Sequence, residues 1–239
     1  ELNRRFYLAF GGAFGATRRR LQPGAQRVIA SLPLDGAWLD LGCGSGEVAR
    51  HLAARGFTGS YTGLDFSPSL LEEACQGWPS PSGAFCPAFR LADLTAPDWA
   101  EPLAPAGFDV ILCLAALHHL PGQELRLSLL RQARSLLKKD GVFIHSEWQF
   151  QHSPRLMARR LPWHTVGLDE AALDPGDTLL DWLYALPGQA ERRGLRYVHL
   201  FTPQELSLLA EASGFVVEES FESDGHGGRL ALYQRWRAA

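Results

Sequence analysis

The chain has few of the residues that mark disulfide-rich or metal-binding proteins. Its 4 cysteines stand singly, with no CxxC pair and no His/Cys cluster at the spacing of metal ligands: Cys43, Cys75, Cys86 and Cys113. This pattern predicts neither a disulfide framework nor a metal site. Isolated thiols are typical of a reducing compartment, so we expect a cytoplasmic protein.

Long apolar runs are also missing. No segment approaches the ~20 apolar residues of a membrane span, so we expect no membrane partner. The segment RRFYLAFGGAFGA has roughly the length of a signal peptide, but TRRR follows where a cleavage site would stand. Phe6, Phe10 and Phe14 recur every fourth residue, which favours a helix with one apolar face.

Lysine is scarce as well. Lys138 and Lys139 are the only two, and arginine supplies the rest of the 23 basic residues. The net charge is -3, so the chain has no overall field that would attract nucleic acid. Its arginines nevertheless cluster, within residues 4–5, 18–20, 155–160, 192–196 and 229–237. Each cluster is either a solvated surface or a local site for phosphate or carboxylate groups.

Strand and helix patterns alternate along the central part of the chain. Strand patterns occur at AWLDLG, GSYTGLD, FDVILCLAA and VFIHSEW, and helical patterns at GEVARHLAARG, SPSLLEEACQ and QELRLSLLRQARSLLKKDG. We expect the last helix to end at Lys138 and Lys139 and to turn at Asp140 and Gly141 into a strand. This order predicts an α/β fold with a doubly wound, mostly parallel sheet.

The end of the chain breaks this alternation. Thr202 and Glu205 form a capping box around Pro203, so a helix should begin at Pro203 and end near Gly214. FVVEESFE and RLALYQRW follow as two strands, and the connection SDGHGG between them is too short for a crossover helix. We therefore expect an antiparallel hairpin at one edge of the sheet.

A glycine loop follows the first strand. Gly42, Gly44 and Gly46 give G-x-G-x-G, which is neither the dinucleotide fingerprint nor the triphosphate loop with its lysine. The glycines still indicate that the backbone closely approaches a ligand. Asp40, at the end of the strand, places a carboxylate in the same region, where it would repel a phosphate and attract an amine.

Two further acids end the next strands. Asp65 lies 19 residues after Gly46, at the position of an acid that holds a ribose diol. Asp93, in RLADLT, follows the expected third strand, where it would meet an adenine amino group. An amine, a ribose and an adenine together describe S-adenosylmethionine, which we predict as the cofactor.

With these residues in this order, the chain resembles the class I, Rossmann-like S-adenosylmethionine-dependent methyltransferases over residues 36–148. FDVILCLAALHHLP and the terminal hairpin belong to the same resemblance. It implies a seven-stranded sheet and S-adenosylhomocysteine as a product. It also implies four aromatic and apolar residues in the cofactor site: Tyr7, Phe66, Leu94 and Leu114.

The flanking segments are similar to a narrower family, the wobble-uridine tRNA methyltransferases that esterify 5-carboxymethyluridine. These enzymes are known as a yeast type and as a domain of AlkB-type tRNA hydroxylases. FGATRRRLQPG resembles their F-S-x-T-R-x-K-P-W-P segment, LRYVHLFTPQEL their R-Y-Y-H-L-F segment, and LHHLP their paired histidines. The chain departs from them at Leu21 and Gln22, which replace Pro-Trp, and at Val198, which replaces a tyrosine.

The resemblance implies two catalytic residues. Arg18 would clamp an acceptor carboxylate, which is already ionised at pH 7 and needs no strong base. His119 would orient or deprotonate the acceptor. The simpler alternatives are a surface position for Arg18 and a turn-capping role for His119 or its neighbour His118.

Four further residues are candidates for substrate contacts. Tyr197 and His199 share one face of a predicted strand, and Arg196 takes the other. Trp148, like Tyr7, would cover the sulfonium or stack on a base. Ordinary strand and core packing is the alternative for all of them.

Three functions remain open from the sequence, and the resemblance favours the first of them. The first is O-methylation of a carboxymethyl group on a tRNA wobble uridine. The second is methylation of a carboxylate or hydroxyl on a small molecule, and the third is a cofactor-binding subunit that acts through an activating protein partner.

The length of 239 residues and a hydrophobic content of 46% suit a single domain. We expect it to comprise an N-terminal helical cap (1–32), a cofactor-binding core (33–150), an inserted substrate lid (151–195) and a C-terminal helix with the hairpin (196–239). The lid carries prolines at 154, 162, 175 and 187, and DTLLDWLYAL predicts a short helical patch.

Overall fold

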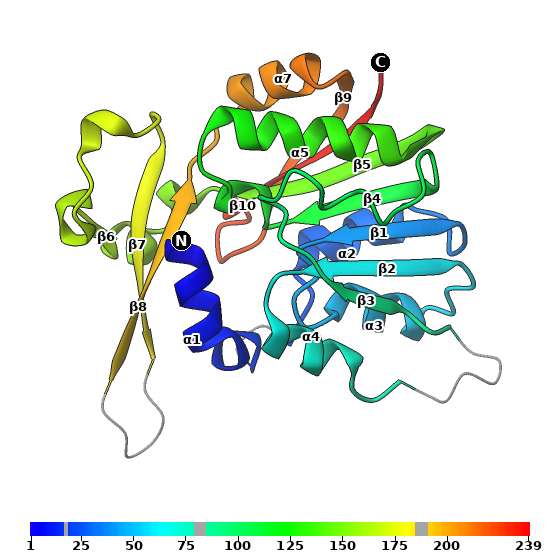
Figure 1. Cartoon of the computed structure of the whole chain (residues 1–239), viewed down its shortest axis with the longest axis horizontal. Coiled ribbons are helices and arrows are strands. Elements are labelled where there is room, and N and C mark those ends of the chain that lie inside the picture. The colour runs from blue at the N-terminus through cyan, green and yellow to red at the C-terminus, as the bar shows by residue number, and fades with distance from the viewer. Residues whose placement is uncertain (17–18, 79–84, 185–190) are drawn as a thin grey trace.

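A seven-stranded sheet in the order β3-β2-β1-β4-β5-β10-β9 forms the centre of the computed structural model (Figure 1). The structure describes residues 1–16, 19–78, 85–184 and 191–239. The strands are β1 (Ala37–Leu41), β2 (Ser60–Asp65), β3 (Ala88–Leu91), β4 (Phe108–Leu114), β5 (Leu137–Trp148), β9 (Phe215–Ser223) and β10 (Ala231–Ala238). The first five are parallel, and β10 pairs antiparallel with both β5 and β9. The predicted fold class, with its edge hairpin, is confirmed.

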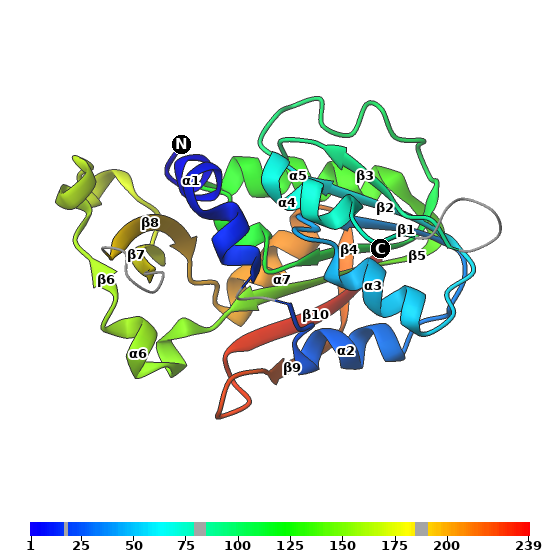
Figure 2. The ribbon, with the colours of Figure 1, turned by 90° about the horizontal axis from the view of Figure 1, so that it is seen from below.

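Helices cover both faces of this sheet (Figures 1 and 2). They are α2 (Pro23–Ala30), α3 (Glu47–Ala54), α4 (Pro68–Cys75), α5 (Gln123–Leu136) and α7 (Pro203–Ala212). On β4, Ile111 and Cys113 pack into the core with α5 and α7, whereas Val110 and Leu112 pack into the core with α2 and α3. The continuous apolar run of β4 is therefore the result of burial on both faces.

The boundary between α5 and β5 differs from the prediction. The helix ends at Leu136, and Lys138 and Lys139 belong to β5 instead of the helix terminus. Leu137 pairs with Phe108 of β4, and a register irregularity follows before the regular pairing resumes. The exposed lysines occupy this irregular stretch, where Lys138 donates a hydrogen bond to Asp109 at 2.7 Å.

A second, three-stranded antiparallel sheet lies beside the first: β6 (Arg160–Leu161), β7 (Asp177–Tyr184) and β8 (Arg192–His199). The predicted helical patch at DTLLDWLYAL is wrong, because residues 177–184 are β7. Leu179 packs against Trp163 on one side of this sheet, and Leu180 packs against Phe150 on the other. A strand that is buried on both faces does not alternate apolar and polar residues, so its apolar run is indistinguishable from that of a short helix.

The second sheet extends to His199. Strand β8 crosses the position between residues 195 and 196 where the sequence suggested the end of the lid. Short helical segments lie in the connections: η1 (Leu117–His119) follows β4, η2 (Phe150–His152) and α6 (Pro154–Met157) lead from β5 to the second sheet, and η3 (Trp163–Val166) and η4 (Glu170–Ala172) lie between β6 and β7.

The N-terminal helix α1 (Leu2–Ala16) lies between β8 and α4 (Figure 1). As the sequence predicted, Phe6 and Phe10 are buried, and their rings pack against Trp182. The side chain of Phe14 lies outside the described part of the structure. Among the described helices, none has the length and apolar character that a membrane crossing requires.

Candidate active site

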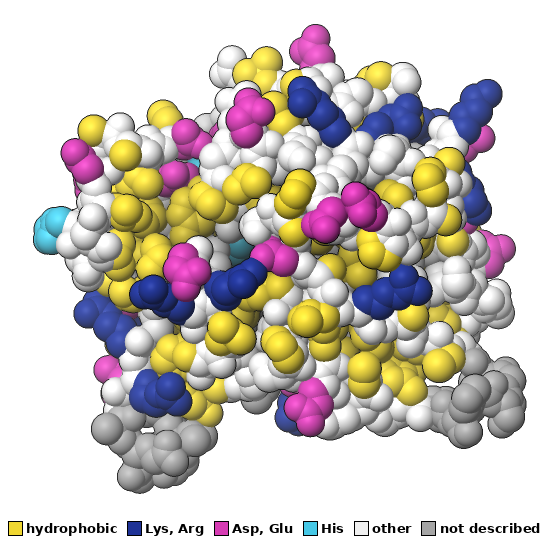
Figure 3. All heavy atoms as spheres, in the orientation of Figure 1, with side chains coloured by type: hydrophobic (Ala, Val, Ile, Leu, Met, Phe, Trp, Pro, Cys, Tyr) yellow, Lys and Arg dark blue, Asp and Glu magenta, His cyan; other side chains and the backbone are white. Residues whose placement is uncertain are grey.

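A cavity of about 950 Å³ lies where the carboxyl ends of β1, β2 and β4 meet α1 and the second sheet. Figure 3 shows this face of the molecule, where apolar side chains gather between the two sheets. Its volume is near the upper end of the usual range for ligand sites, about 300–1,000 Å³, so a cofactor and an acceptor fit together. The carboxyl ends of parallel strands are also the usual ligand position in this fold class.

The three loop glycines serve different purposes. All have positive φ, between +53° and +81°. A Cβ atom on Gly42 would lie 2.7 Å from the Cβ of Ala116, and one on Gly46 would lie 3.0 Å from the ring of Phe89, so both positions are closed by packing. A Cβ on Gly44 would meet no heavy atom within 4 Å. Gly42 and Gly44 line the cavity and Gly46 does not, so Gly44 is the glycine whose missing side chain keeps ligand space open.

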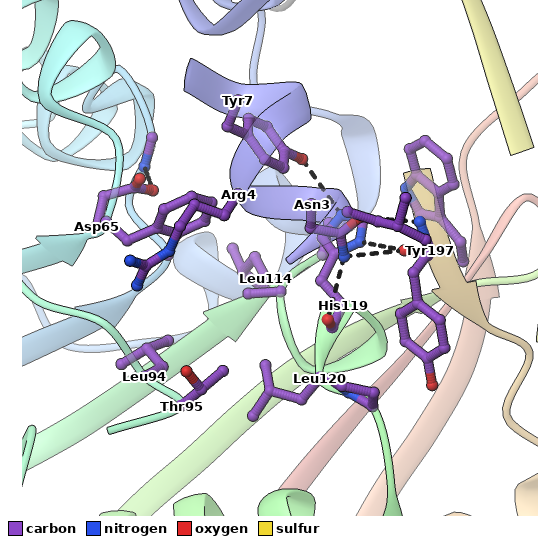
Figure 4. Close-up of a pocket in the computed structure, with 18 of the residues that line it drawn as sticks. Asn3, Arg4, Tyr7, Asp65, Leu94, Thr95, Leu114, His119, Leu120 and Tyr197 are labelled. Carbon is purple, nitrogen blue, oxygen red and sulfur yellow. Dashed lines mark hydrogen bonds between the residues drawn. The ribbon is translucent and has the colours of Figure 1, made fainter. Parts of the chain in front are cut away.

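Asp65 organises this loop from the end of β2. Its Oδ2 accepts a hydrogen bond from the Gly44 amide at 2.9 Å (Figure 4). Its Oδ1 accepts one from the Ser67 amide at 2.8 Å. Burial raises the pKa of Asp65, against the lowering effect of these bonds. The carboxylate thus lines the cavity and also fixes the glycine loop.

Asp40, near the carboxyl end of β1, lies at the same cavity. It is buried, lines the cavity and accepts a hydrogen bond from the Tyr61 hydroxyl at 2.5 Å. Burial raises the pKa of Asp40 to about 7, although the bond from Tyr61 lowers it. The side chain is therefore divided between its neutral and ionised forms near neutral pH.

Asp93 is the third acid, and a residue of α1 contacts it. Arg4 forms an ion pair with Asp93, whose other oxygen accepts hydrogen bonds from the amide and hydroxyl of Thr95. Figure 4 shows Arg4 between Asp65 and Leu94, on the same side of the cavity. The four apolar and aromatic residues that the resemblance implied also line it: Tyr7, Phe66, Leu94 and Leu114.

His119 faces the cavity from η1, and both its ring nitrogens have partners (Figure 4). Nδ1 lies 3.1 Å from the carbonyl oxygen of Tyr197, and Nε2 lies 3.3 Å from the hydroxyl of Tyr7. Because a carbonyl only accepts, Nδ1 carries a hydrogen, and in the neutral ring Nε2 then accepts from the Tyr7 hydroxyl. This tautomer suits a group that orients an acceptor or takes its proton.

His118 points the other way. It is fully buried, and its Nδ1 lies 2.9 Å from Glu147, which also binds His145 at 2.8 Å. The structure therefore places only one of the paired histidines at the cavity.

The structure separates the four candidate substrate residues. Tyr197 and Trp148 line the cavity, whereas Arg196 and His199 do not. Arg196 is buried between the rings of Phe6 and Trp148, with its guanidinium carbon 5.0 and 5.1 Å from their centres. A direct substrate contact is thus unsupported for Arg196, because these rings enclose its guanidinium group.

His199 belongs to a buried ionic network that sequence patterns did not reveal. Its ring lies 2.6 Å from Asp177 and 2.8 Å from Glu205. Burial lowers the pKa of His199, but these two bonds outweigh burial and hold it above its ordinary value. Arg126 of α5, only 1% exposed, joins the network and donates to the Tyr197 hydroxyl at 2.7 Å. Arg126 appeared in sequence only as one polar position of an amphipathic helix.

The arginine clusters contribute little to the cavity. Arg4 and Arg20 are the Lys or Arg side chains that line it within residues 1–16, 19–78, 85–184 and 191–239. Arg159 and Arg193 pair with Asp181 on the second sheet. Arg18, the expected clamp, lies outside the described residues. Within the described ranges, no group of three His, Cys, Asp or Glu side chains is arranged to hold a metal ion.

Comparisons with known proteins agree with this architecture. A family described as "Methyltransferase domain" matches residues 14–220. The putative methyltransferase YqeM of Bacillus subtilis is 30% identical over 126 residues, which cover 51% of this chain and 47% of that protein. The tRNA (carboxymethyluridine(34)-5-O)-methyltransferase of Schizosaccharomyces pombe is 25% identical over 228 residues, covering 88% of this chain and 87% of that protein.

The fold is also found among solved structures. A Burkholderia thailandensis 1,6-didemethyltoxoflavin-N1-methyltransferase, solved with 1,6-didemethyltoxoflavin and S-adenosylhomocysteine, superposes with a TM-score of 0.64 at 19% identity. The match covers 100% of this chain and 88% of that one. The chain spans about half of the Bacillus relative and most of the fission-yeast one. On the family match across most of its length, the chain belongs to the methyltransferase domain family.

Proposed function

We propose that this methyltransferase uses S-adenosylmethionine to methylate an acceptor oxygen placed beside His119. The observation that carries the proposal is the position of His119, which lines a cavity that also contains the glycine loop and three strand-end acids. The sulfonium of S-adenosylmethionine carries a methyl group that is already electrophilic. The protein is then left to align the acceptor and to receive its proton, and alignment alone supplies up to ~7–11 kcal/mol.

The cavity fits this cofactor. Asp65 and Asp93 supply acceptors for hydroxyl and amino hydrogens, and the open space at Gly44 admits a close approach to the backbone. Phe66 and Leu94 provide apolar walls on the same side. Asp40 offers a carboxylate for a cationic amino group, which would favour its ionised form.

Cofactor binding is therefore expected to release a proton below pH 7. The pKa of Asp40 is about 7 before binding, so at pH 6 most of this side chain is protonated, and a neighbouring ammonium group lowers the pKa and expels the proton. Calorimetry with S-adenosylhomocysteine, in buffers of different ionisation enthalpy, should show release of up to about one proton at pH 6 and almost none at pH 8.5.

The Asp40→Asn variant is the control for this measurement. It should bind more weakly and without proton release at either pH. Equal release by the wild type and the variant would show that another group titrates.

The acceptor side of the cavity favours a small molecule. Trp148, Trp163 and Leu173 form an apolar wall there, together with the carboxylates of Asp174 and Asp177. Arg4 lies on the cofactor side (Figure 4), which leaves Arg20 as the other cavity-lining cation among the described residues. Because a hydroxyl must lose its proton during transfer, a small hydroxylated acceptor also makes full use of His119.

A carboxymethyluridine in tRNA is the second candidate. The similarity to the fission-yeast enzyme extends over 88% of this chain, and Arg20, from the TRRR segment, reaches the cavity. An acceptor carboxylate would need orientation by His119 but no deprotonation.

Transfer of labelled methyl groups distinguishes the two acceptors. The purified protein and labelled S-adenosylmethionine should be incubated with hydroxylated aromatic and aliphatic acids, and separately with tRNA that carries free carboxymethyluridine. We expect label in a small product, at a rate that changes little between 50 and 200 mM salt. Label in tRNA, with a steep loss of affinity over that range, would favour the second candidate. Cofactor-loaded protein that labels none of these acceptors would contradict the proposal.

A further inference from the structure

The side chain of Asn3, in the first turn of α1, fastens three elements together at the edge of the cavity. Its amide nitrogen donates to the carbonyl oxygens of His119, at 3.1 Å, and Tyr197, at 3.0 Å. Its oxygen accepts from the Tyr197 amide at 2.8 Å (Figure 4). Both amide hydrogens and the oxygen are thus used. The opposite amide orientation would set donor against donor and acceptor against acceptor.

These bonds are tertiary contacts and not part of the backbone hydrogen bonding of α1. They join residues 116 and 194 positions apart in the chain, so they attach the helix to η1 and β8. On β8, Asn3 binds both the N–H and the C=O of Tyr197, as a neighbouring strand would. The Tyr197 peptide is consequently held in place from the side of α1.

The Tyr197 carbonyl is also the group that sets the tautomer of His119. It accepts from Nδ1 of that ring at 3.1 Å and from Asn3 at 3.0 Å. One turn further along α1, the Tyr7 hydroxyl lies 3.3 Å from Nε2. Attachment of α1 through Asn3 therefore fixes the partners of both ring nitrogens.

We propose that Asn3 is a positioning residue for the reaction: it holds the Tyr197 carbonyl, which keeps the hydrogen of His119 on Nδ1, so that Nε2 exchanges its hydrogen bond from the Tyr7 hydroxyl for one from the acceptor. This inference rests on the proposed function, because it assigns Asn3 a place in the same methyl transfer. Asn3 acts through Tyr197 and His119, and the acceptor oxygen is left to His119.

Kinetics of the Asn3→Asp variant test the inference. The carboxylate has almost the same shape, keeps an acceptor for the Tyr197 amide and loses both donors. We expect kcat to fall ~10- to 100-fold through misplacement of His119, with the KM values and the cofactor Kd within about twofold of wild type. Arg5→Gln, on the exposed side of the same helix turn, is the matched control and should keep wild-type kinetics.

Binding stoichiometry separates positioning from folding. If kcat per cofactor-binding site, counted by calorimetry, is unchanged in Asn3→Asp, the inference is wrong. In a His119→Gln background, Asn3→Asp should lower kcat by less than about twofold further, because both changes remove the same function. Additive losses would overturn the assignment.

A second measurement needs no acceptor. In ¹⁵N spectra of histidine-labelled protein with S-adenosylhomocysteine, wild-type His119 should be the Nδ1–H tautomer, and Asn3→Ala should lower that population. An unchanged tautomer in Asn3→Ala would contradict the positioning role. If the tautomer shifts but wild type methylates no acceptor, the proposed function fails and the geometric inference stands. If wild type methylates normally and Asn3 variants match it, only the inference fails.

Discussion

Replacing His119 with glutamine is expected to lower kcat by ~10²- to 10⁴-fold for a hydroxyl acceptor, the usual contribution of a positioned general base. Glutamine preserves much of the size and hydrogen bonding of the ring but cannot take a proton. The cofactor Kd should stay within about twofold, since the cofactor-side acids are untouched. Initial rates under saturating cofactor and acceptor, with calorimetry for the Kd, provide the measurement.

His226→Gln is the matched control, because His226 is exposed in the hairpin connection and should leave the rate unchanged. The size of the loss also reports on the acceptor. A carboxylate is already ionised, so a loss below about tenfold in His119→Gln would point to orientation alone and to the carboxymethyluridine candidate. A wild-type rate in the variant would exclude His119 from the reaction.

Gly44→Ala is expected to weaken cofactor binding by about 5- to 150-fold. The new methyl group would enter the open space beside the glycine loop, and forcing an extra carbon into an occupied site costs about 1–3 kcal/mol. Calorimetric titration with S-adenosylhomocysteine measures this loss directly.

Gly56→Ala separates that effect from backbone strain. Gly56 has φ of +76°, against +53° at Gly44, and a Cβ atom there would also meet nothing within 4 Å. It follows α3, away from the cavity lining. Both alanines should lower the free energy of unfolding by about 1–2 kcal/mol, the cost of a left-handed L-residue, in urea titrations. Only Gly44→Ala should lose affinity, and equal affinity losses in both variants would place the cofactor elsewhere.

Most of the cofactor-site prediction depended on local sequence patterns at the ends of the predicted strands. The glycine loop directly follows β1, and Asp65 ends β2, so parallel strands were enough to predict that they share one sheet edge. The position after β4 applied equally to His118 and His119, and the choice of His119 came from the resemblance to the wobble-uridine methyltransferases. Gly46 was assigned to the ligand, yet its backbone position is required by packing against Phe89, which no local pattern reveals.

The second sheet was the main error of the fold prediction. Apolar residues of β7 are buried against different partners on each face, so a short strand had the hydrophobic pattern of a helix. The same limit applies to Lys138 and Lys139, whose place in β5 depends on the pairing of their neighbour Leu137 with Phe108 of β4.

By itself, the sequence determined the doubly wound sheet, the edge hairpin and the loop with its three acids, because hydrophobic period, turn residues and strand order are local properties of the chain. Only the tertiary structure decided that His119 and not His118 faces the cavity, that Arg126 and His199 share a buried network, and that Asn3 reaches Tyr197. Those contacts join residues tens to nearly two hundred positions apart. Their geometry depends on how α1 and the second sheet pack against the large sheet, which no periodicity within either segment specifies.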